Sequence, residues 1–246
     1  MTIQRKASTI LTLAISLTMG AASAEAGDQP AAATAPVKQT AATSSWQDDF
    51  GLATCKLATS GRSAYFVLEP GHQLVLEHRG TRMQITVLDQ TQEVNGVITR
   101  VVEEREWENG ELAEVSRNYY AFCEQTRDVL HFGEDVENYV NGKLANTSGT
   151  WRAGDGNRPG LVIAGSPRLN MKYYQEIAPG VTMNRGEVVS LNETCKTAAG
   201  TFTQCMKVRG TSGMDPKKLE YKYYAPNIGL VKDESLSLVK VNPPKP

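Results

Sequence analysis

The residues of this chain that are best suited to chemistry lie in the segment Val97–Phe122, around an Asn109-Gly110 pair. Asn-Gly is typical of the two-residue turn of a β-hairpin, because both residues tolerate a positive φ. Side chains alternate between the two faces of a strand, so a simple hairpin register places Arg100 opposite Tyr119 and gathers a mixed set on one face. That set comprises Ile98, Arg100, Val102, Glu104, Val115, Arg117, Tyr119 and Ala121.

The two arginines of this face are suited to recognising an anionic group. A guanidinium is a planar fork that binds carboxylate or phosphate through two parallel hydrogen bonds. We therefore predict a ligand site in which both arginines meet an acidic head group and apolar neighbours hold the rest of the molecule. The predicted ligand-binding residues are Arg100, Arg117, Glu104, Tyr119, Val102 and Val115. The alternative is an ion-pair network, joined by Asp89, that only fixes the register of the hairpin.

Acidic residues form the second group that could do chemistry. Six Glu lie between Glu103 and Glu114, where they favour either a cation site or a solvated hairpin tip that discourages edge pairing. Two facing carboxylates could also act as acid and base in glycoside hydrolysis. The acids available for such a pair are Glu103, Glu104, Glu134, Asp135 and Glu176.

Familiar catalytic and metal-binding motifs are absent from the sequence. It contains no G-x-S-x-G turn, no H-E-x-x-H pair and no ordered calcium loop. The three histidines, His72, His78 and His131, follow no metal-ligand spacing. We therefore predict no metal site and no cofactor, and we assign no catalytic residue.

Strands are the elements that must position these residues. Asn-Gly pairs at 95–96, 109–110 and 141–142 each separate two segments rich in β-formers, and helical periodicity is weak. We predict an all-β fold with few short helices, in which a single large twisted antiparallel sheet curls into an open barrel or clasp. The expected strands are Met83–Leu88, Val97–Trp107, Leu112–Phe122, Val129–Phe132, Leu161–Ile163, Val188–Leu191, Thr201–Arg209, Leu219–Tyr224 and Leu236–Val241.

The N-terminal segment has the features of an export signal. Arg5 and Lys6 precede a short apolar run over 10–19, and Ala22-Ser23-Ala24 is a cleavage site of the A-x-A type. The sequence thus predicts a signal peptide over 1–24, a disordered Ala/Thr/Pro tether over 25–45 and a single β-rich domain over 46–242. It places the mature protein in the periplasm or outside the cell, with no transmembrane span.

The overall composition is that of a globular protein. Hydrophobic residues make up 40% of the chain and charged residues 22%, which excludes disorder throughout. The 26 basic and 27 acidic side chains give a net charge of -1. This balance provides no long-range attraction to nucleic acid, so we predict no nucleic-acid partner and leave the oligomeric state open.

The four cysteines fit an oxidising compartment. A hairpin centred on Gly200 would place Cys195 opposite Cys205, which leaves Cys55 to pair with Cys123. We expect these two disulfides, although four cysteines permit three connectivities and the sequence alone does not choose among them.

The segment 220–233 reads Glu-Tyr-Lys-Tyr-Tyr-Ala-Pro-Asn-Ile-Gly-Leu-Val-Lys-Asp. It resembles the C-terminal signature of an uncharacterised family of exported bacterial β-rich proteins, and Thr99–Glu104, Phe132–Val136 and Tyr174–Gly180 resemble other segments of that family. This resemblance implies export and a β-fold, and it transfers no catalytic residue. More loosely, Tyr223–Lys232 is similar to the closing strands of the periplasmic half-barrels that carry lipoproteins, which implies a curved sheet that holds a lipid-like molecule.

Three functions are consistent with these features. The leading hypothesis is an exported, non-enzymatic protein whose curved sheet binds an apolar or amphipathic molecule, such as a lipid or another envelope component. A hydrolase of an envelope polymer would instead use a Glu/Asp pair in one cleft, with one pKa raised. A structural or interaction module would have a filled interior and no small-molecule ligand.

Overall fold

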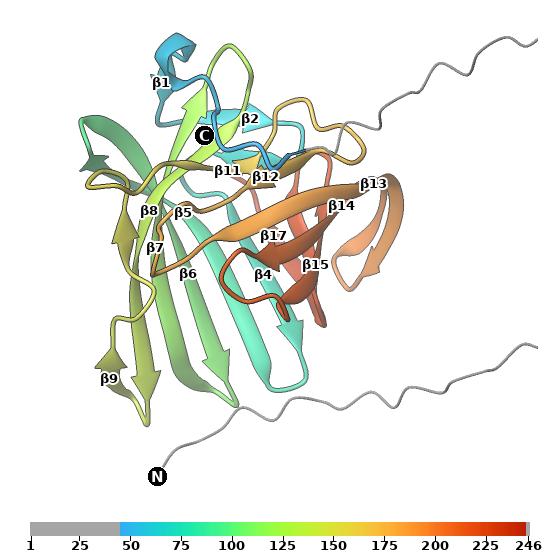
Figure 1. Ribbon diagram of the computed structural model, residues 1–246. Helices are drawn as coiled ribbons and strands as arrows, with labels where there is room; N and C mark the ends of the chain where they lie inside the picture. The colour runs from blue at the N-terminus through green and yellow to red at the C-terminus, as the bar shows by residue number, and fades with distance from the viewer. Residues whose placement is uncertain (1–44, 245–246) are drawn as a thin grey trace, which may run out of the picture. The chain divides into compact units, whose positions relative to one another are not determined.

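Strands form most of the chain in the computed structural model, which describes residues 45–244 (Figure 1). The predicted signal peptide over 1–24, and the predicted tether apart from its last residue, lie outside the described residues. The elements are a short 3-10 helix, η1 (Leu52–Thr54), and the strands β1 (Leu57–Ala58), β2 (Gly61–Ser63), β3 (Phe66–Leu68), β4 (Gln73–His78), β5 (Thr81–Val94), β6 (Val97–Glu108), β7 (Glu111–Cys123), β8 (Val129–Val140), β9 (Lys143–Asn146), β10 (Trp151–Arg152), β11 (Gly160–Ile163), β12 (Lys172–Tyr174), β13 (Asn184–Thr197), β14 (Gly200–Ser212), β15 (Leu219–Ala225), β16 (Gly229–Asp233) and β17 (Leu236–Asn242).

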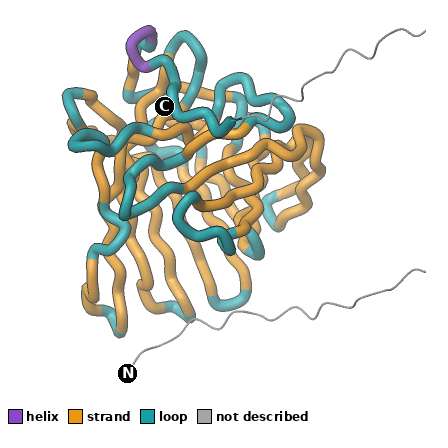
Figure 2. The backbone as a smooth tube through the Cα atoms, in the orientation of Figure 1, coloured by secondary structure: helices purple, strands orange, loops and turns teal. Residues whose placement is uncertain are grey.

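One antiparallel sheet contains nearly all of these strands. Its order is β10-β8-β7-β6-β5-β4-β17-β16-β15-β14-β13-β12, with β1 added to β7, and with β9 and β11 added to β8. The pairing of β4 with β17 joins the first half of the sheet to the last strand of the chain. The sheet curls without closing into a barrel, which confirms the predicted all-β class and the open architecture. Most of the longer loops gather at one end of the long strands (Figure 2).

Tight turns at Asn-Gly pairs connect β5 to β6, β6 to β7, and β8 to β9. Asn95, Asn109 and Asn141 have φ values of 48°, 52° and 52°, and the glycine after each is also at positive φ. Few other residues adopt this pair of conformations without strain. The three turns predicted from the sequence are therefore confirmed.

The register of the β6–β7 hairpin differs from the simple one predicted from the sequence. Trp107 pairs with Leu112 as expected, but Glu106 pairs with Glu114, so Ala113 is an extra residue in β7. This is a β-bulge, and it shifts every later pair by one position. Arg117 consequently lies opposite Glu103, and Arg100 lies opposite Tyr120. The prediction that Arg100 faces Tyr119 and that Arg117 shares its face is wrong.

The apolar core lies on the inner face of the curled sheet. Leu76, Leu238, Met206, Val188 and Tyr173 come from five different strands and are almost fully buried. Burial of each such side chain contributes about 1.5–3 kcal/mol relative to exposure.

Two glycines that face each other across β13 and β14 leave room for large inner side chains. Gly186 pairs with Gly210. A Cβ added at Gly186 would lie 2.9 Å from the ring of Tyr173, and one at Gly210 would lie 2.5 Å from Cγ of Glu220. Each glycine therefore provides the space that a neighbouring side chain occupies.

The cysteines fall into one disulfide and one pair of neighbouring thiols. Cys55 and Cys123 form a disulfide with a Cα–Cα distance of 5.3 Å, in agreement with the predicted pair. Cys195 and Cys205 are both buried and unbridged. Burial and the adjacent Cys205 raise the pKa of the Cys195 thiol to about 12. The second bridge thus remains a prediction.

Within residues 45–244 the only helix is η1, and no helix there has the length and apolar character needed to cross a bilayer.

We expect Cys195 and Cys205 to be joined by a disulfide when the protein is produced in an oxidising compartment, because the two side chains already lie in contact. Iodoacetamide added in denaturant before reduction should then label no cysteine, whereas reduction first should expose all four. Labelling of Cys195 or Cys205 in the unreduced protein would contradict this expectation.

Candidate functional site

The inner face of the sheet surrounds a cavity of about 240 Å³. Its wall is mainly polar and comes from both halves of the sheet, with Phe66 of β3 and Val162 of β11 adding apolar cover. The titratable side chains that line it are Glu104, Glu114, Glu134, Glu176, Glu220, Lys218, Lys222, His131, Tyr120 and Tyr224. A cavity that collects this many ionisable groups is the leading candidate for the functional site.

The pairing of β6, β7 and β8 determines which side chains form one side of the cavity. Glu104 of β6 pairs with Ser116 of β7, and Asn118 of β7 pairs with Glu134 of β8. Because paired residues project from the same face of a sheet, these side chains stand next to one another on the inner wall. The bulge at Ala113 sets this arrangement, since it determines which β7 residues share a face with Glu104.

Every second side chain of β15 faces the cavity and forms its opposite side. Glu220, Lys222 and Tyr224 point inward. Lys222 Nζ lies 3.2 Å from Oδ2 of Asp233 and 3.9 Å from Oε1 of Glu220. Burial opposes the charge of Lys222, yet Asp233 and the other surrounding carboxylates raise its pKa well above the ordinary value. This lysine is therefore a fixed cation in the wall of the cavity.

Glu176 is held at a third point of the wall by hydrogen bonds. Its Oε2 accepts from Asn184 Nδ2 at 2.6 Å and from the hydroxyl of Thr182. Its Oε1 lies 3.8 Å from Nδ1 of His131, whose Nε2 lies 3.0 Å from the carbonyl oxygen of Gly133. Burial lowers the pKa of His131, which keeps the imidazole neutral near pH 7.

Carboxylates outnumber cations around the cavity, and two of them titrate far from the usual range. Burial, with smaller effects from other carboxylates, raises the pKa of Glu104 to about 7, although the Lys222 ammonium opposes the rise. Burial, together with repulsion from Glu176 and Glu104, raises the pKa of Glu134 to about 8. At neutral pH the site therefore retains a proton that an exposed glutamate would have lost.

Two of the six predicted ligand-binding residues face this cavity. Glu104 and Val102 line it. Tyr119 is turned away: its hydroxyl donates to Oδ2 of Asp135 at 2.6 Å, and the Arg152 guanidinium carbon lies 4.2 Å from the centre of its ring.

The remaining three predicted residues lie elsewhere. Arg117 is on the outer face of the sheet, where it pairs with Glu103 at 3.2 Å and Glu137 at 3.1 Å. Val115 shares that face and is buried. Arg100 is at the end of the sheet, where its guanidinium donates to the carbonyl of Thr59 and to neighbouring acceptors, so its donors are used by the fold. The predicted meeting of two guanidiniums on one apolar wall does not occur, because the bulge separates them.

Sequence reasoning missed Lys222, Glu220 and His131 as cavity residues. The signal for the first two was present, since Glu220-Tyr221-Lys222-Tyr223-Tyr224 alternates charged and aromatic residues as a strand does. The meeting of β15 with β6–β8 across the cavity was not predictable, because it depends on the curl of the whole sheet.

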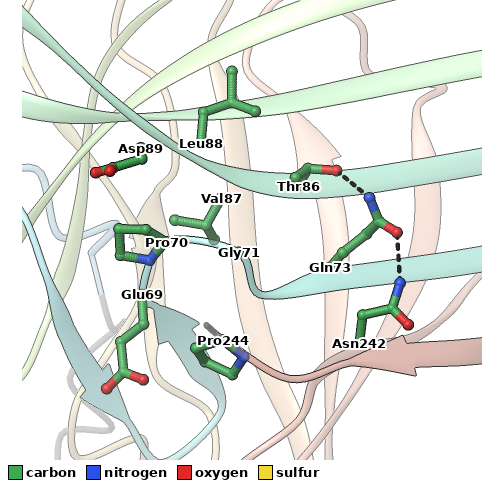
Figure 3. Close-up of a pocket in the computed structure, with 10 residues that line it drawn as sticks. All are labelled: Glu69, Pro70, Gly71, Gln73, Thr86, Val87, Leu88, Asp89, Asn242 and Pro244. Carbon is green, nitrogen blue, oxygen red and sulfur yellow. Dashed lines mark hydrogen bonds between the residues drawn. The ribbon is translucent and has the colours of Figure 1, made fainter. Parts of the chain in front are cut away.

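A second hollow lies beside the start of β4, the middle of β5 and the end of β17, and its volume is about 700 Å³ (Figure 3). Gln73 Nε2 donates to the hydroxyl of Thr86 at 2.9 Å, and Asn242 Nδ2 donates to Oε1 of Gln73 at 2.8 Å. Its two acids are engaged, Glu69 with Arg62 and Asp89 with Arg100. This hollow is wide and lacks the inward-facing ionisable groups of the inner cavity, so we regard it as the weaker candidate.

No three His, Cys, Asp or Glu side chains within the described part of the chain are arranged to hold a metal ion. The chemistry available in the cavity is therefore that of its carboxyl, ammonium, imidazole, amide and phenol groups.

No family model, curated protein or solved structure matches the chain. The family resemblance noted in the sequence thus stays a prediction, and the geometry of the cavity carries the functional argument.

The raised pKa of Glu134 predicts how stability depends on pH. The folded state holds this proton up to about pH 8, whereas the unfolded chain releases it near pH 4.5, so the folded protein loses stability as pH rises through that window. Glu134→Gln removes this loss. We expect the variant to gain on the order of 1–3 kcal/mol over the parent protein between pH 5 and pH 9, measured by urea unfolding.

Glu137→Gln is the matched control for this experiment. Tyr139 and Arg117 lower the pKa of Glu137, so its contribution to stability is present at neutral pH and is lost as pH falls. The control should be less stable than the parent protein at pH 7 and should approach it in acid. Equal pH dependence of the Glu134→Gln variant and the parent protein would show that Glu134 titrates normally.

Proposed function

We propose that this protein binds a small, polar, positively charged molecule in the cavity of its curved sheet. The observation that carries the proposal is the charge of the wall, where five glutamates face two lysines. The proposal keeps the binding role predicted from the sequence. It changes the ligand from an amphipathic molecule with an anionic head group to a polar cation, because the arginines meant to meet that head group lie outside the cavity.

Repulsion between the carboxylates is the physical reason for preferring a cation. Burial is the main reason that the pKa values of Glu104 and Glu134 are raised, and repulsion from neighbouring carboxylates adds to the rise. A bound cation relieves the same repulsion and allows the protons to leave. Inside a protein this attraction is several times stronger than in water, because the surroundings screen it less.

The remainder of the wall is suited to a small, partly polar ligand. Asn118 and Gln175 supply hydrogen-bonding groups, and Tyr120 adds an aromatic side chain to the wall. A volume of about 240 Å³ limits the ligand to a small molecule. A purely structural module would have no need for such a cavity.

Export is part of the proposal. The signal segment predicted over 1–24 would direct the chain to the periplasm or beyond. The Cys55–Cys123 disulfide is compatible with that compartment.

Calorimetric titration tests the charge of the ligand. Putrescine, spermidine, choline and glucosamine are cationic probes of suitable size, and acetate, glutamate and palmitate are anionic ones. At least one cation should bind, and more tightly as pH rises from about 6 to 9, because Glu104 and Glu134 ionise over that range. Binding of palmitate with no response to any cation would contradict the proposal and favour the amphipathic ligand.

A pair of variants on the same strand localises the binding. Glu104→Gln should weaken the affinity for the bound cation by about tenfold or more, because it removes a carboxylate from the wall. Glu103→Gln alters the neighbouring residue, which faces outward toward Arg105 and Arg117, and should leave the affinity unchanged. Equal losses in both variants would place the ligand elsewhere.

A second candidate function is hydrolysis of a polar polymer of the cell envelope. The observation that favours it is that two carboxyls in one cavity have raised pKa values, so that Glu134 could donate a proton while Glu104 accepts one. Enzymatic hydrolysis of a glycosidic bond at neutral pH needs such an acid and such a base.

Release of reducing ends from peptidoglycan or chitin oligosaccharides tests this candidate. Activity should be greatest between about pH 7 and 8, where Glu104 is ionised and Glu134 is protonated. Glu134→Gln should lower the rate by about 10²–10⁴-fold, and Glu103→Gln should retain it. The absence of reducing ends from both substrates would remove the hydrolase from consideration.

A further inference from the structure

The outer face of the second half of the sheet carries a concentration of positive charge. The strand pairing from β12 to β16 places five basic side chains on the face opposite to the cavity. The cations are Lys172, Arg185, Lys207, Arg209 and Lys232. We call these five residues, with the aromatic residues between them, the basic–aromatic surface.

Aromatic rings alternate with the cations in one part of this surface. Lys207 and Lys232 both lie opposite Tyr223 in the ladder, one on each side. Lys207 Nζ is 4.4 Å from the ring centre of Tyr221 and 5.3 Å from that of Tyr223, and Lys232 Nζ is 5.9 Å from Tyr223. Cation–π attraction favours positions of these long side chains beside the rings and along the sheet.

The same pattern recurs at the β12 edge. The guanidinium carbon of Arg185 lies 4.6 Å from a ring centre of Trp46 and 5.9 Å from that of Tyr174, and Lys172 Nζ is 5.9 Å from Trp46. The pattern of cation beside ring thus spans the face from β12 to β16.

Acids on the same rows neutralise little of this charge. Glu187 pairs with Arg209, and Glu193 lies near Lys207. Five cations against these two acids leave positive charge in excess on the surface.

We infer that the basic–aromatic surface binds an acidic polysaccharide that lies across strands β12–β16. The cations lie on β12, β13, β14 and β16, and the row of five strands spans about 19 Å at the usual strand spacing, which suits an extended polyanion better than a compact ion. Sugar rings can stack against the aromatic side chains while carboxylate or sulfate groups meet the lysines and arginines. This site is distinct from the cavity, and the inference does not depend on the proposed cavity ligand.

An anionic bilayer fits the surface less well. Membrane association by a surface of this kind combines basic residues with apolar side chains that enter the lipid. On these rows of the described structure, Leu219 is the single large apolar side chain that is well exposed. The face therefore provides charge and flat rings without the apolar anchors that a bilayer needs.

Binding to immobilised heparin and to polygalacturonate tests the inference with a sulfated and a carboxylated polymer. The parent protein should bind at least one of them, with an affinity that falls as salt is added. Lys207→Glu combined with Lys232→Glu should weaken binding by about tenfold or more, because two attractive charges become repulsive. Glu134→Gln in the cavity should leave polymer binding intact.

Lys143→Glu combined with Lys240→Glu is the matched control, since it makes the same change in net charge at two exposed lysines outside the surface. It should retain most of the affinity. Equal loss in both double variants would reduce the effect to net charge and overturn the inference. So would failure to bind either polymer, or preferential binding to phosphatidylglycerol vesicles or to single-stranded DNA. Thermal unfolding of each variant verifies that the fold is intact.

Discussion

A single extra residue, Ala113, determines which chemistry the inner face of this sheet presents. The turn at Asn109-Gly110 starts the β6–β7 pairing, and the bulge that follows shifts all later pairs by one position. Side chains alternate across a strand, so this shift brings Glu104 beside Ser116 on the inner wall and sends Arg117 to the outer face. Without the bulge, arginine would face the cavity and offset the carboxylates there. The strand register therefore determines which side chains face the cavity, and this makes the site acidic.

The sheet separates charge that is nearly balanced in the whole chain. Glutamates dominate the inner cavity, while lysines and arginines collect on the outer face of β12–β16. The separation arises because β15 alternates Glu220 and Lys222 inward with tyrosines outward, and β14 adds basic residues beside those tyrosines. Net charge is therefore a poor guide to binding in this protein, since the potential near each face depends on the local groups. The two proposed sites therefore present opposite charges on opposite faces of the sheet.

The sequence was sufficient to predict the fold class and the three Asn-Gly turns, because alternation and turn chemistry are local signals. It also indicated Glu104 and Val102 as members of a site. It could not reveal the bulge at Ala113, because nothing in that residue or its neighbours distinguishes a regular pair from a bulged one. It could not reveal the partnership of Lys222 with Glu104 either, since these residues lie more than a hundred positions apart and meet only through the curl of the sheet. Local patterns predicted the strands, whereas the curl of the whole sheet, which brings together residues far apart in the sequence, determined the site.

Gly210 links the backbone to the electrostatics of the cavity. The space above its α-carbon is filled by the side chain of Glu220, which in turn lies near Lys222 and Lys218. A methyl group at this position would displace a flexible carboxylate rather than the strand. A substitution at this uncharged residue would then rearrange the ion pairs of two lysines. The charge distribution in the cavity can therefore change while every ionisable residue stays the same.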